Sequence, residues 1–513
     1  MAKPKTLRLI LGDQLNSKHS WFRTAEKHVT YVLMEVMQET TYTLHHIQKV
    51  VGFFAAMRAF AESLKRHGHR VLYFSLDDRE NKQTFEDNIR DLIRKYGFDR
   101  FEYQLPDEYR LDLQLKAMER TLSIPVSAVD TEHFLTDRAS VQRMFTGKKR
   151  FLMESFYRGM RAEHNVLMDN GKPSGGEWNF DRENRRRYDR RVALPSPKCF
   201  TNDVRSITDM LARMNVRTFG DIEPEQFIWP VDRRQSLALL RSFLKEGLPH
   251  FGTYEDAMTV ESWALFHSRL SFALNTKMLH PMEVIDAAVE EWKENKDTIA
   301  LHQVEGFVRQ ILGWREFMRG VYWAMMPKFS SANYFAHTTK LPHYYWDGKT
   351  TMKCMQIAIG QSLRYAYAHH IQRLMITGNF ALLTGIDPEA VDAWYLGVYI
   401  DAIEWVEMPN TRGMSQFADG GMIATKPYVA SANYIKKMSD YCTGCSYDPS
   451  VKYGERACPF NSLYWDFHVR HRKMLERNPR IGMVYRTWDR IAESEQDRIL
   501  RQARVYKQRL EEL

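Results

Sequence analysis

An amino-terminal α/β domain followed by a large all-helical domain is the fold class that this sequence predicts. Short apolar runs alternate with amphipathic segments near the start of the chain, which is the pattern of βαβ units that build a parallel, Rossmann-like sheet. A polar segment rich in Gly, Pro and Arg follows, and beyond it the pattern is helical to the end, with many Trp, Tyr and Met residues. We therefore expect an α/β domain over residues 1–134, an interdomain linker over 135–225 and an all-α domain over 226–513.

The first domain alternates predicted strands and predicted helices. The expected strands are the apolar runs Leu7–Leu11, Val29–Met34, Arg70–Ser75 and Arg100–Gln104, and the expected helices are Val50–Arg66 and Phe85–Tyr96. Ligands of parallel sheets bind beyond the carboxyl ends of the strands, which places residues 12–15 and 35–39 where a small molecule would lie. No G-x-G-x-x-G motif follows the first strand, so the dinucleotide fingerprint is absent.

Composition and charge narrow the classes of function. The 513 residues are 44% hydrophobic and 27% charged, ordinary values that exclude wholesale disorder. No run of about 18 uncharged apolar residues occurs, and the first residues lack the apolar core and cleavage site of a signal peptide. We therefore expect a cytoplasmic protein without a membrane span. The formal net charge of +9 favours a polyanionic partner such as nucleic acid.

Three of the five cysteines lie close together and indicate a metal site. Cys442 and Cys445 form a C-x-x-C pair, whose tight turn points both sulfurs inward, and Cys458 follows after twelve intervening residues. The fourth ligand is either Cys354 or a histidine. Zinc and a 4Fe–4S cluster both fit four thiolates, and the step from Cys458 to Pro459 favours the cluster. The alternative is a set of buried free thiols; so few cysteines argue against a disulfide framework.

Three segments of the helical region indicate a protein family when they are considered together. Core packing would explain each segment alone. They are H-S-R-L-S at residues 267–271, G-W-R-E-F at 313–317 and H-H-I-Q-R-L-M at 369–375. In this order and spacing they resemble the flavin- and lesion-binding segments of the photolyase/cryptochrome family. I-L-G-D-Q-L at 10–15, G-M-S-Q-F-A-D-G-G at 413–421 and the cysteines are similar to its bacterial iron–sulfur branch, the prokaryotic (6-4) photolyases. The resemblance covers nearly the whole chain.

The resemblance implies three cofactors. FAD phosphates would be bound by the segment that contains His267, Ser268, Leu270 and Ser271. An ion pair of Arg315 and Asp401 would lie beside the flavin ring, and Glu407 would lie near flavin N5. A 4Fe–4S cluster would be bound by Cys354, Cys442, Cys445 and Cys458, which leaves Cys199 as the spare cysteine. The antenna chromophore 6,7-dimethyl-8-ribityllumazine would lie against Gly12, Asp13, Gln14, Leu15, Glu35 and Glu39.

The activity that the resemblance implies is light-driven repair of (6-4) photoproducts in UV-damaged DNA, carried out by a monomer. Excited reduced flavin supplies an electron, and the lesion then needs a proton, which histidine can donate near neutral pH. We expect His369 to be the general acid and His370 to orient it or to contact flavin, because adjacent helical residues point about 100° apart. Trp394, Tyr395 and Trp346 would carry electrons from the surface to oxidised flavin, with Trp394 nearest the ring.

Repair also requires a surface that binds the DNA backbone, because a lesion has to rotate out of the duplex to reach a buried flavin. Arg185–Arg191 and Lys148–Arg150 are candidates for phosphate contacts, which position DNA without reading its sequence; a solvated linker face is the alternative for the arginines. Two other functions stay open. One is a cryptochrome-type blue-light photoreceptor with the same cofactors, and the other is a nucleic-acid-binding protein with an iron–sulfur site and no photochemistry.

Overall fold

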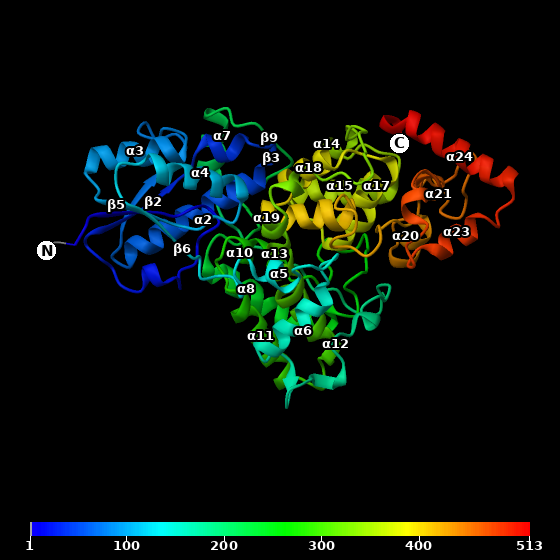
Figure 1. Ribbon diagram of the computed structural model, residues 1–513, viewed down its shortest axis with the longest axis horizontal. Helices are drawn as coiled ribbons and strands as arrows, with labels where there is room; N and C mark the ends of the chain where they lie inside the picture. Colours follow the sequence, from blue (N-terminus) through cyan, green and yellow to red (C-terminus); the bar gives the residue numbers. More distant parts are fainter. Residues whose placement is uncertain (1–2) are drawn as a thin grey trace.

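A five-stranded parallel sheet forms the centre of the amino-terminal part of the computed structural model, which describes residues 3–513 (Figure 1). The strands are ordered β4-β2-β1-β5-β6, and every neighbouring pair is parallel. Their bounds are Thr6–Leu9 (β1), Val29–Met34 (β2), Arg70–Phe74 (β4), Arg100–Gln104 (β5) and Val126–Val129 (β6). The predicted α/β class is confirmed, and β6 is a strand that the sequence analysis missed.

Local signals explain where the helices of this part begin and end. The main helices between the strands are α2 (Ile47–Arg66), α3 (Phe85–Tyr96) and α4 (Tyr109–Thr121). α3 matches its prediction, because the Thr84 hydroxyl accepts a hydrogen bond from the Asp87 amide at its start and Gly97 ends it in the left-handed region, at φ 61°. α2 begins earlier than predicted, because the His46 ring accepts a hydrogen bond from the Gln48 amide and caps the helix there.

The segment that follows the sheet contains helices that pack on both parts of the molecule. α5 (Ser140–Met144) and α6 (Met153–Glu163) pack on α13 (Glu316–Met325) of the helical region, whereas α7 (Arg205–Arg213) packs on α2. The chain between α6 and α7 carries only short elements, among them the paired strands β7 (Met168–Asp169) and β8 (Lys172–Pro173). The domain boundaries at residues 134 and 225 stay predictions.

The rest of the chain is predominantly helical, as predicted, and α20 to α24 lie at the end of the molecule opposite the sheet (Figure 1). Besides α13, its helices are α8 (Arg233–Ser242), α9 (Leu248–Phe251), α10 (Ser271–Asn275), α11 (Pro281–Glu294), α12 (Leu301–Val308), α14 (Tyr344–Asp347), α15 (Lys353–Tyr365), α16 (His370–Gln372), α17 (Asn379–Thr384), α18 (Pro388–Val398), α19 (Glu404–Met408), α20 (Ala432–Met438), α21 (Pro459–Arg470), α22 (Arg472–Leu475), α23 (Gly482–Trp488) and α24 (Glu493–Gln508). Four π-helical turns continue some of them: η4 (Phe243–Gly247), η5 (Arg309–Arg315), η7 (Arg373–Gly378) and η8 (Pro409–Ser415).

One face of the sheet shares a continuous apolar core with the helical region, and α2 lies at their junction, whereas the other face packs in a separate cluster with α3 and α4. Gly52 allows the close approach, since a Cβ atom at this position would lie 3.0 Å from Ile400 Cδ1 and 3.3 Å from Phe272 Cζ. This contact fixes the loop around Ile400 between the two parts of the molecule. Among the described residues, no helix has both the length and the apolar character needed to cross a membrane.

Candidate active site and cofactor sites

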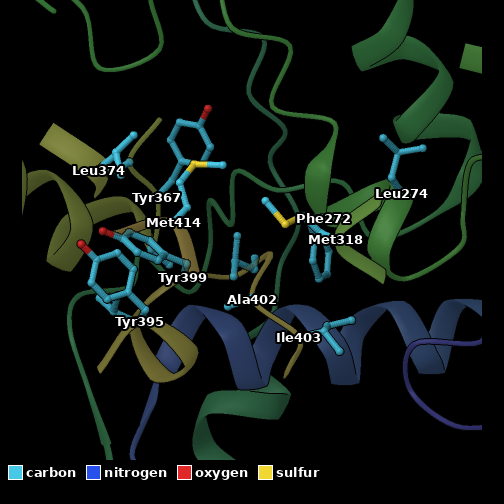
Figure 2. Packing of buried hydrophobic residues seen from close by; sticks show 14 of the residues in the cluster. Phe272, Leu274, Met318, Tyr367, Leu374, Tyr395, Tyr399, Ala402, Ile403 and Met414 are labelled. Atoms are coloured by element: carbon cyan, nitrogen blue, oxygen red, sulfur yellow. The ribbon is translucent and has the colours of Figure 1, made fainter. Parts of the chain in front are cut away.

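The helical region contains a cavity of about 800 Å³, a volume within the range of small-molecule and cofactor sites. The π-helical turns η5, η7 and η8 all contribute to its wall, and such turns are frequent at functional sites. Tyr395 and Tyr399 form part of the wall and lie side by side in Figure 2, with ring centroids 5.5 Å apart. Every residue predicted to bind flavin lines this cavity, namely His267, Ser268, Leu270, Ser271, Arg315, Asp401 and Glu407.

Asp401 forms its ion pair with Arg373, so the predicted pairing of Asp401 with Arg315 is wrong. The Arg373 guanidinium donates two hydrogen bonds of 3.0 Å to the Asp401 carboxylate, which is the bidentate geometry that arginine favours. Arg315 donates instead to the His133 ring at 2.9 Å and lies beside Glu316; burial lowers its pKa to about 10. The π-helical turn η7 starts at Arg373 and places it at the cavity wall, so Arg373 is a site residue that the sequence analysis missed.

Glu407 is a buried carboxyl group at the cavity wall, where it accepts a hydrogen bond from the Thr411 hydroxyl. Burial and the nearby Asp392 carboxylate raise the pKa of Glu407 well above its ordinary value. The raised pKa favours the protonated carboxyl group, the form that can donate a hydrogen bond into the cavity.

The two adjacent histidines of the lesion-binding motif have different surroundings. His369 is 2% exposed, and its ring stacks on His267 with centroids 4.6 Å apart. Neither ring nitrogen of His369 has a hydrogen-bond partner among residues 3–513, which is uncommon for buried polar groups. Burial, with the neighbouring histidines and Arg373, holds the pKa of His369 well below its usual range. His370 also lines the cavity, but it is exposed. Of the two histidines, His369 is therefore the buried one whose ring nitrogens are free to bind a ligand in the cavity.

Trp394 and Tyr395 are in contact, with ring centroids 5.3 Å apart. Tyr395 lines the cavity, whereas Trp394 lies behind it, and the place of Trp394 nearest the flavin stays a prediction. Adjacent residues of α18 point about 100° apart, and it is the Tyr395 hydroxyl that reaches η7, where it donates to the Arg373 carbonyl at 2.6 Å. Trp346 is half-buried and packs against Phe219, with ring centroids 5.1 Å apart.

A second cavity lies where the sheet meets the helical region. Gly12, Asp13 and Glu39 line it, beyond the carboxyl ends of β1 and β2. Lys49 of α2 lines it too, and burial lowers the pKa of its ammonium group to about 8. Ala402 lines both this cavity and the large one, so the two cavities share a wall.

The other three residues predicted to contact an antenna do not line this cavity, and their role in antenna binding stays a prediction. Glu35 is fully buried, and its carboxylate accepts hydrogen bonds from Arg58 and from the Leu76 amide. Gln14 closes the turn after β1 through hydrogen bonds with backbone groups, and Leu15 belongs to the apolar core. Each of these side chains is used within the fold, because successive residues at a strand end point in different directions.

The four cysteines predicted as cluster ligands surround one small cavity; they are Cys354, Cys442, Cys445 and Cys458. Cys354 lies in α15, Cys458 directly precedes α21 and the other two lie in the loop after α20, so this site joins α15 to the carboxyl-terminal helices. Cys199 is exposed and does not line the cavity. Within residues 3–513, no three His, Cys, Asp or Glu side chains are arranged to hold a single metal ion.

Basic side chains surround the mouth of the large cavity, where Arg185, Lys426 and Arg480 line it. The arginines of the run Arg185–Arg191 are exposed, and most of them pair with acidic neighbours, as in Arg185–Asp181, Arg186–Glu183, Arg190–Glu261 and Arg191–Asp189. Lys148–Arg150 is exposed as well. Exposed ion pairs contribute little free energy, so they do not prevent these arginines from binding phosphate.

Comparison with known proteins adds four findings. Residues 8–227 match a family model described as deoxyribodipyrimidine photo-lyase-related protein. Over 490 residues, 95% of this chain and 96% of the relative, the sequence is 44% identical to a (6-4) photolyase of Agrobacterium fabrum. The fold is similar to that of a bacterial class III photolyase from Agrobacterium tumefaciens, with a TM-score of 0.59, 17% identity and 92% of each chain covered. It is also similar to that of a cryptochrome from Synechocystis, with a TM-score of 0.56, 12% identity and coverage of 97% of this chain and 94% of the other.

Proposed function

This chain belongs to the photolyase/cryptochrome family, in its prokaryotic branch, and on that premise we propose that it is a DNA photolyase that uses light to repair (6-4) photoproducts. The observation that carries the choice of lesion is the 44% identity, over nearly the full length of both chains, to a relative named (6-4) photolyase. The unpaired ring nitrogens of His369 at the wall of a cofactor-sized cavity support the same reading.

FAD is the cofactor that this family implies, and the residues of the large cavity suit it. Ring nitrogen Nε2 of His267 and atom Nε of Arg315 are buried without hydrogen-bond partners among the described residues, so both can bind a polar ligand. The Arg373–Asp401 pair and the buried Glu407 carboxyl group, whose pKa is raised, add polar groups to the wall. When bound, FAD supplies the electron that light drives to the lesion.

The chain's own contribution to the chemistry is the His369 imidazole, which would take a proton from solvent and pass it to the lesion. The ring is neutral at neutral pH in the free protein, because burial lowers its pKa. A lesion that has gained an electron carries negative charge, and a negative charge nearby raises the pKa of an imidazole. His369 can therefore take up a proton and donate it when the lesion needs it.

The cysteine cavity supports a 4Fe–4S cluster bound by Cys354, Cys442, Cys445 and Cys458, because four thiolates are the usual ligand set of such clusters. Its role in this proposal is chiefly structural, since the site joins α15 to the carboxyl-terminal helices. The cavity lined by Gly12, Asp13 and Glu39 has a volume of about 110 Å³, below the roughly 300–1,000 Å³ of most small-molecule sites, so the assignment of a lumazine-type antenna to it rests on the family resemblance. Its shared wall at Ala402 would place an absorbing molecule close to the flavin cavity.

The absorption spectrum of the purified protein tests all three cofactor assignments at once. The proposal expects flavin bands, a lumazine band and a broad cluster shoulder. A protein without flavin bands would be an iron–sulfur nucleic-acid-binding protein and no photolyase. If flavin is present, a repair assay is needed to distinguish a photolyase from a photoreceptor.

Trp346→Phe is expected to slow light-driven reduction of oxidised flavin. Tyr345, the sequence neighbour of Trp346 in α14, has its ring centroid 5.2 Å from that of Trp394, so α14 places the half-buried Trp346 next to a residue that contacts the aromatic residues behind the cavity. Phenylalanine keeps most of the apolar bulk and removes the readily oxidised indole. Time-resolved absorption measures the rate, and Trp465→Phe in α21, a tryptophan that packs on Trp488, is the control. Unaltered photoreduction with full flavin content would refute the role of Trp346.

Binding of UV-damaged DNA is expected to weaken steeply with salt, because contacts with phosphates release counterions. Arg187 is exposed and has no ion-pair partner among the described residues, so Arg187→Gln should reduce the slope of log affinity against log salt by about 1. Arg213→Gln in α7, which breaks a surface pair with Asp77, should leave the slope unchanged. Equal slopes for all three proteins would remove Arg187 from the DNA interface.

A further inference from the structure

A chain of buried hydrogen bonds joins the cysteine site to the start of the histidine helix. Tyr441 directly precedes Cys442, lines the cysteine cavity and is 1% exposed. Its hydroxyl oxygen accepts a hydrogen bond of 3.0 Å from Nε2 of Gln372. Atom Oε1 of Gln372 in turn accepts a hydrogen bond of 3.1 Å from the backbone amide of His369. Two side-chain hydrogen bonds therefore connect the residue next to a cysteine with the backbone of the lesion-facing histidine.

A second route from the cysteine site ends at the same glutamine. Gln361 lies in α15, the helix whose first turn carries Cys354. Its side-chain amide pairs reciprocally with that of Gln372: Nε2 of Gln361 donates at 3.1 Å, and Oε1 of Gln361 accepts at 2.9 Å. Gln372 is buried, so Tyr441 and Gln361 hold its amide in one orientation.

Gln372 holds the start of its helix together with Arg373, whose Nε donates to the Ala368 carbonyl at 2.7 Å. α16 comprises only residues 370–372 and leads directly into the π-helical turn η7. The first amides of a helix have no partner within the helix, and in a capping box the third residue accepts from the N-cap amide. Gln372 fills that role for His369, and Arg373, the partner of Asp401, follows it immediately. The orientation of the Gln372 amide thus helps to set where His369 meets the cavity.

We propose that Tyr441 and Gln372 are positioning residues for repair. When the cysteine site is intact, their hydrogen bonds hold His369 in the position that repair needs. The proposal rests on the proposed function in one respect, the assignment of His369 as proton donor. The proposal gives the cysteine site an effect on the cavity wall although it lies away from the cavity. Loss of that site would release Tyr441 and remove one of the hydrogen bonds that hold Gln372 at the start of α16.

Tyr441→Phe tests the relay, and Tyr447→Phe is the matched control. Phenylalanine keeps the ring and removes only the hydroxyl. Tyr447 lines the same cysteine cavity, but its hydroxyl binds Thr351 instead of the histidine helix. Amide hydrogen exchange of the peptide covering residues 369–374 should become about 3- to 10-fold faster in Tyr441→Phe, the effect of losing one buried neutral hydrogen bond, and should not change in Tyr447→Phe. Iron and flavin contents should stay at wild-type values in both variants.

Repair per photon at saturating lesion should fall by a similar factor in Tyr441→Phe, while the affinity for damaged DNA stays unchanged. This split distinguishes a positioning role from general loss of structure. Gln372→Leu leaves the cysteine loop intact and tests the relay even if Tyr441→Phe loses iron. Because both residues act in one chain, the double variant should be no worse than Gln372→Leu alone.

Unchanged exchange in Tyr441→Phe, or effects of the two substitutions that simply add, would overturn the relay. Faster exchange with undiminished repair per photon would overturn its role in positioning His369. Wild-type protein that exchanges as expected but leaves (6-4) lesions unrepaired would count against the proposed function, while the hydrogen-bond chain itself would stand.

Discussion

Cys445→Ala is expected to yield protein that is insoluble or poor in flavin. Cysteines from three segments of the chain meet at one cavity and join α15 to the carboxyl-terminal helices. A structural metal site can contribute about 10–16 kcal/mol of folding free energy in small zinc domains, which is comparable to the whole stability of a typical domain. Loss of one ligand should therefore release α20 to α24 from α15. Soluble yield, the ratio of flavin to protein and iron content measure the effect.

Cys199→Ala is the control, because this cysteine is exposed and lies outside the cavity. It should keep full solubility, flavin and iron. Soluble, flavin-loaded Cys445→Ala protein that lacks iron would contradict the structural role. Wild-type protein that contains zinc and no iron would contradict the cluster itself.

His369→Ala is expected to lower repair per photon by about 10²–10⁴, the usual cost of removing a general acid. The variant should still bind flavin and damaged DNA, since neither needs a proton donor. In the wild type, repair per photon should rise as the pH falls below neutral. The sign follows from the pKa of His369, which burial holds below its usual range, so acidification increases the protonated fraction.

His370→Ala is the matched comparison, because it removes the neighbouring, exposed imidazole at the same cavity. It should lose less activity than His369→Ala. Full repair by His369→Ala together with loss of repair in His370→Ala would move the proton-donor role to His370.

The sequence predicted the fold class because its signals are local. Alternating apolar and amphipathic segments specify a parallel sheet, and caps such as Thr84 and Gly97 set helix ends within the chain itself. Strand β6 was missed because Val126–Val129 is short and no residue in it is fully buried, which leaves little apolar pattern to detect. The residues predicted to bind flavin line one cavity together, because the family resemblance names them as a set; flavin binding by them stays a prediction.

The pairings within the site could not be predicted in the same way. The choice between Arg315 and Arg373 as the partner of Asp401 depends on how helices face one another. The π-helical turns η5 and η7 carry the two arginines, and a π-helical turn shifts the faces that a 3.6-residue period would predict. The partner of Glu35 could not be predicted either. A carboxylate beyond the end of a strand can bind a ligand or an interior side chain, and in the structure Glu35 binds Arg58.

The most direct measurement exposes the reduced, flavin-loaded protein to light together with two oligonucleotides, one with a single (6-4) photoproduct and one with a cyclobutane dimer. Chromatography then gives the fraction of each lesion restored to intact bases. The account predicts that the (6-4) lesion is repaired in the light, that no repair occurs in the dark and that the cyclobutane dimer is left unrepaired. Repair of the dimer alone would leave the fold and cofactor assignments standing and contradict the lesion, and no repair of either would contradict the photolyase function in favour of a photoreceptor.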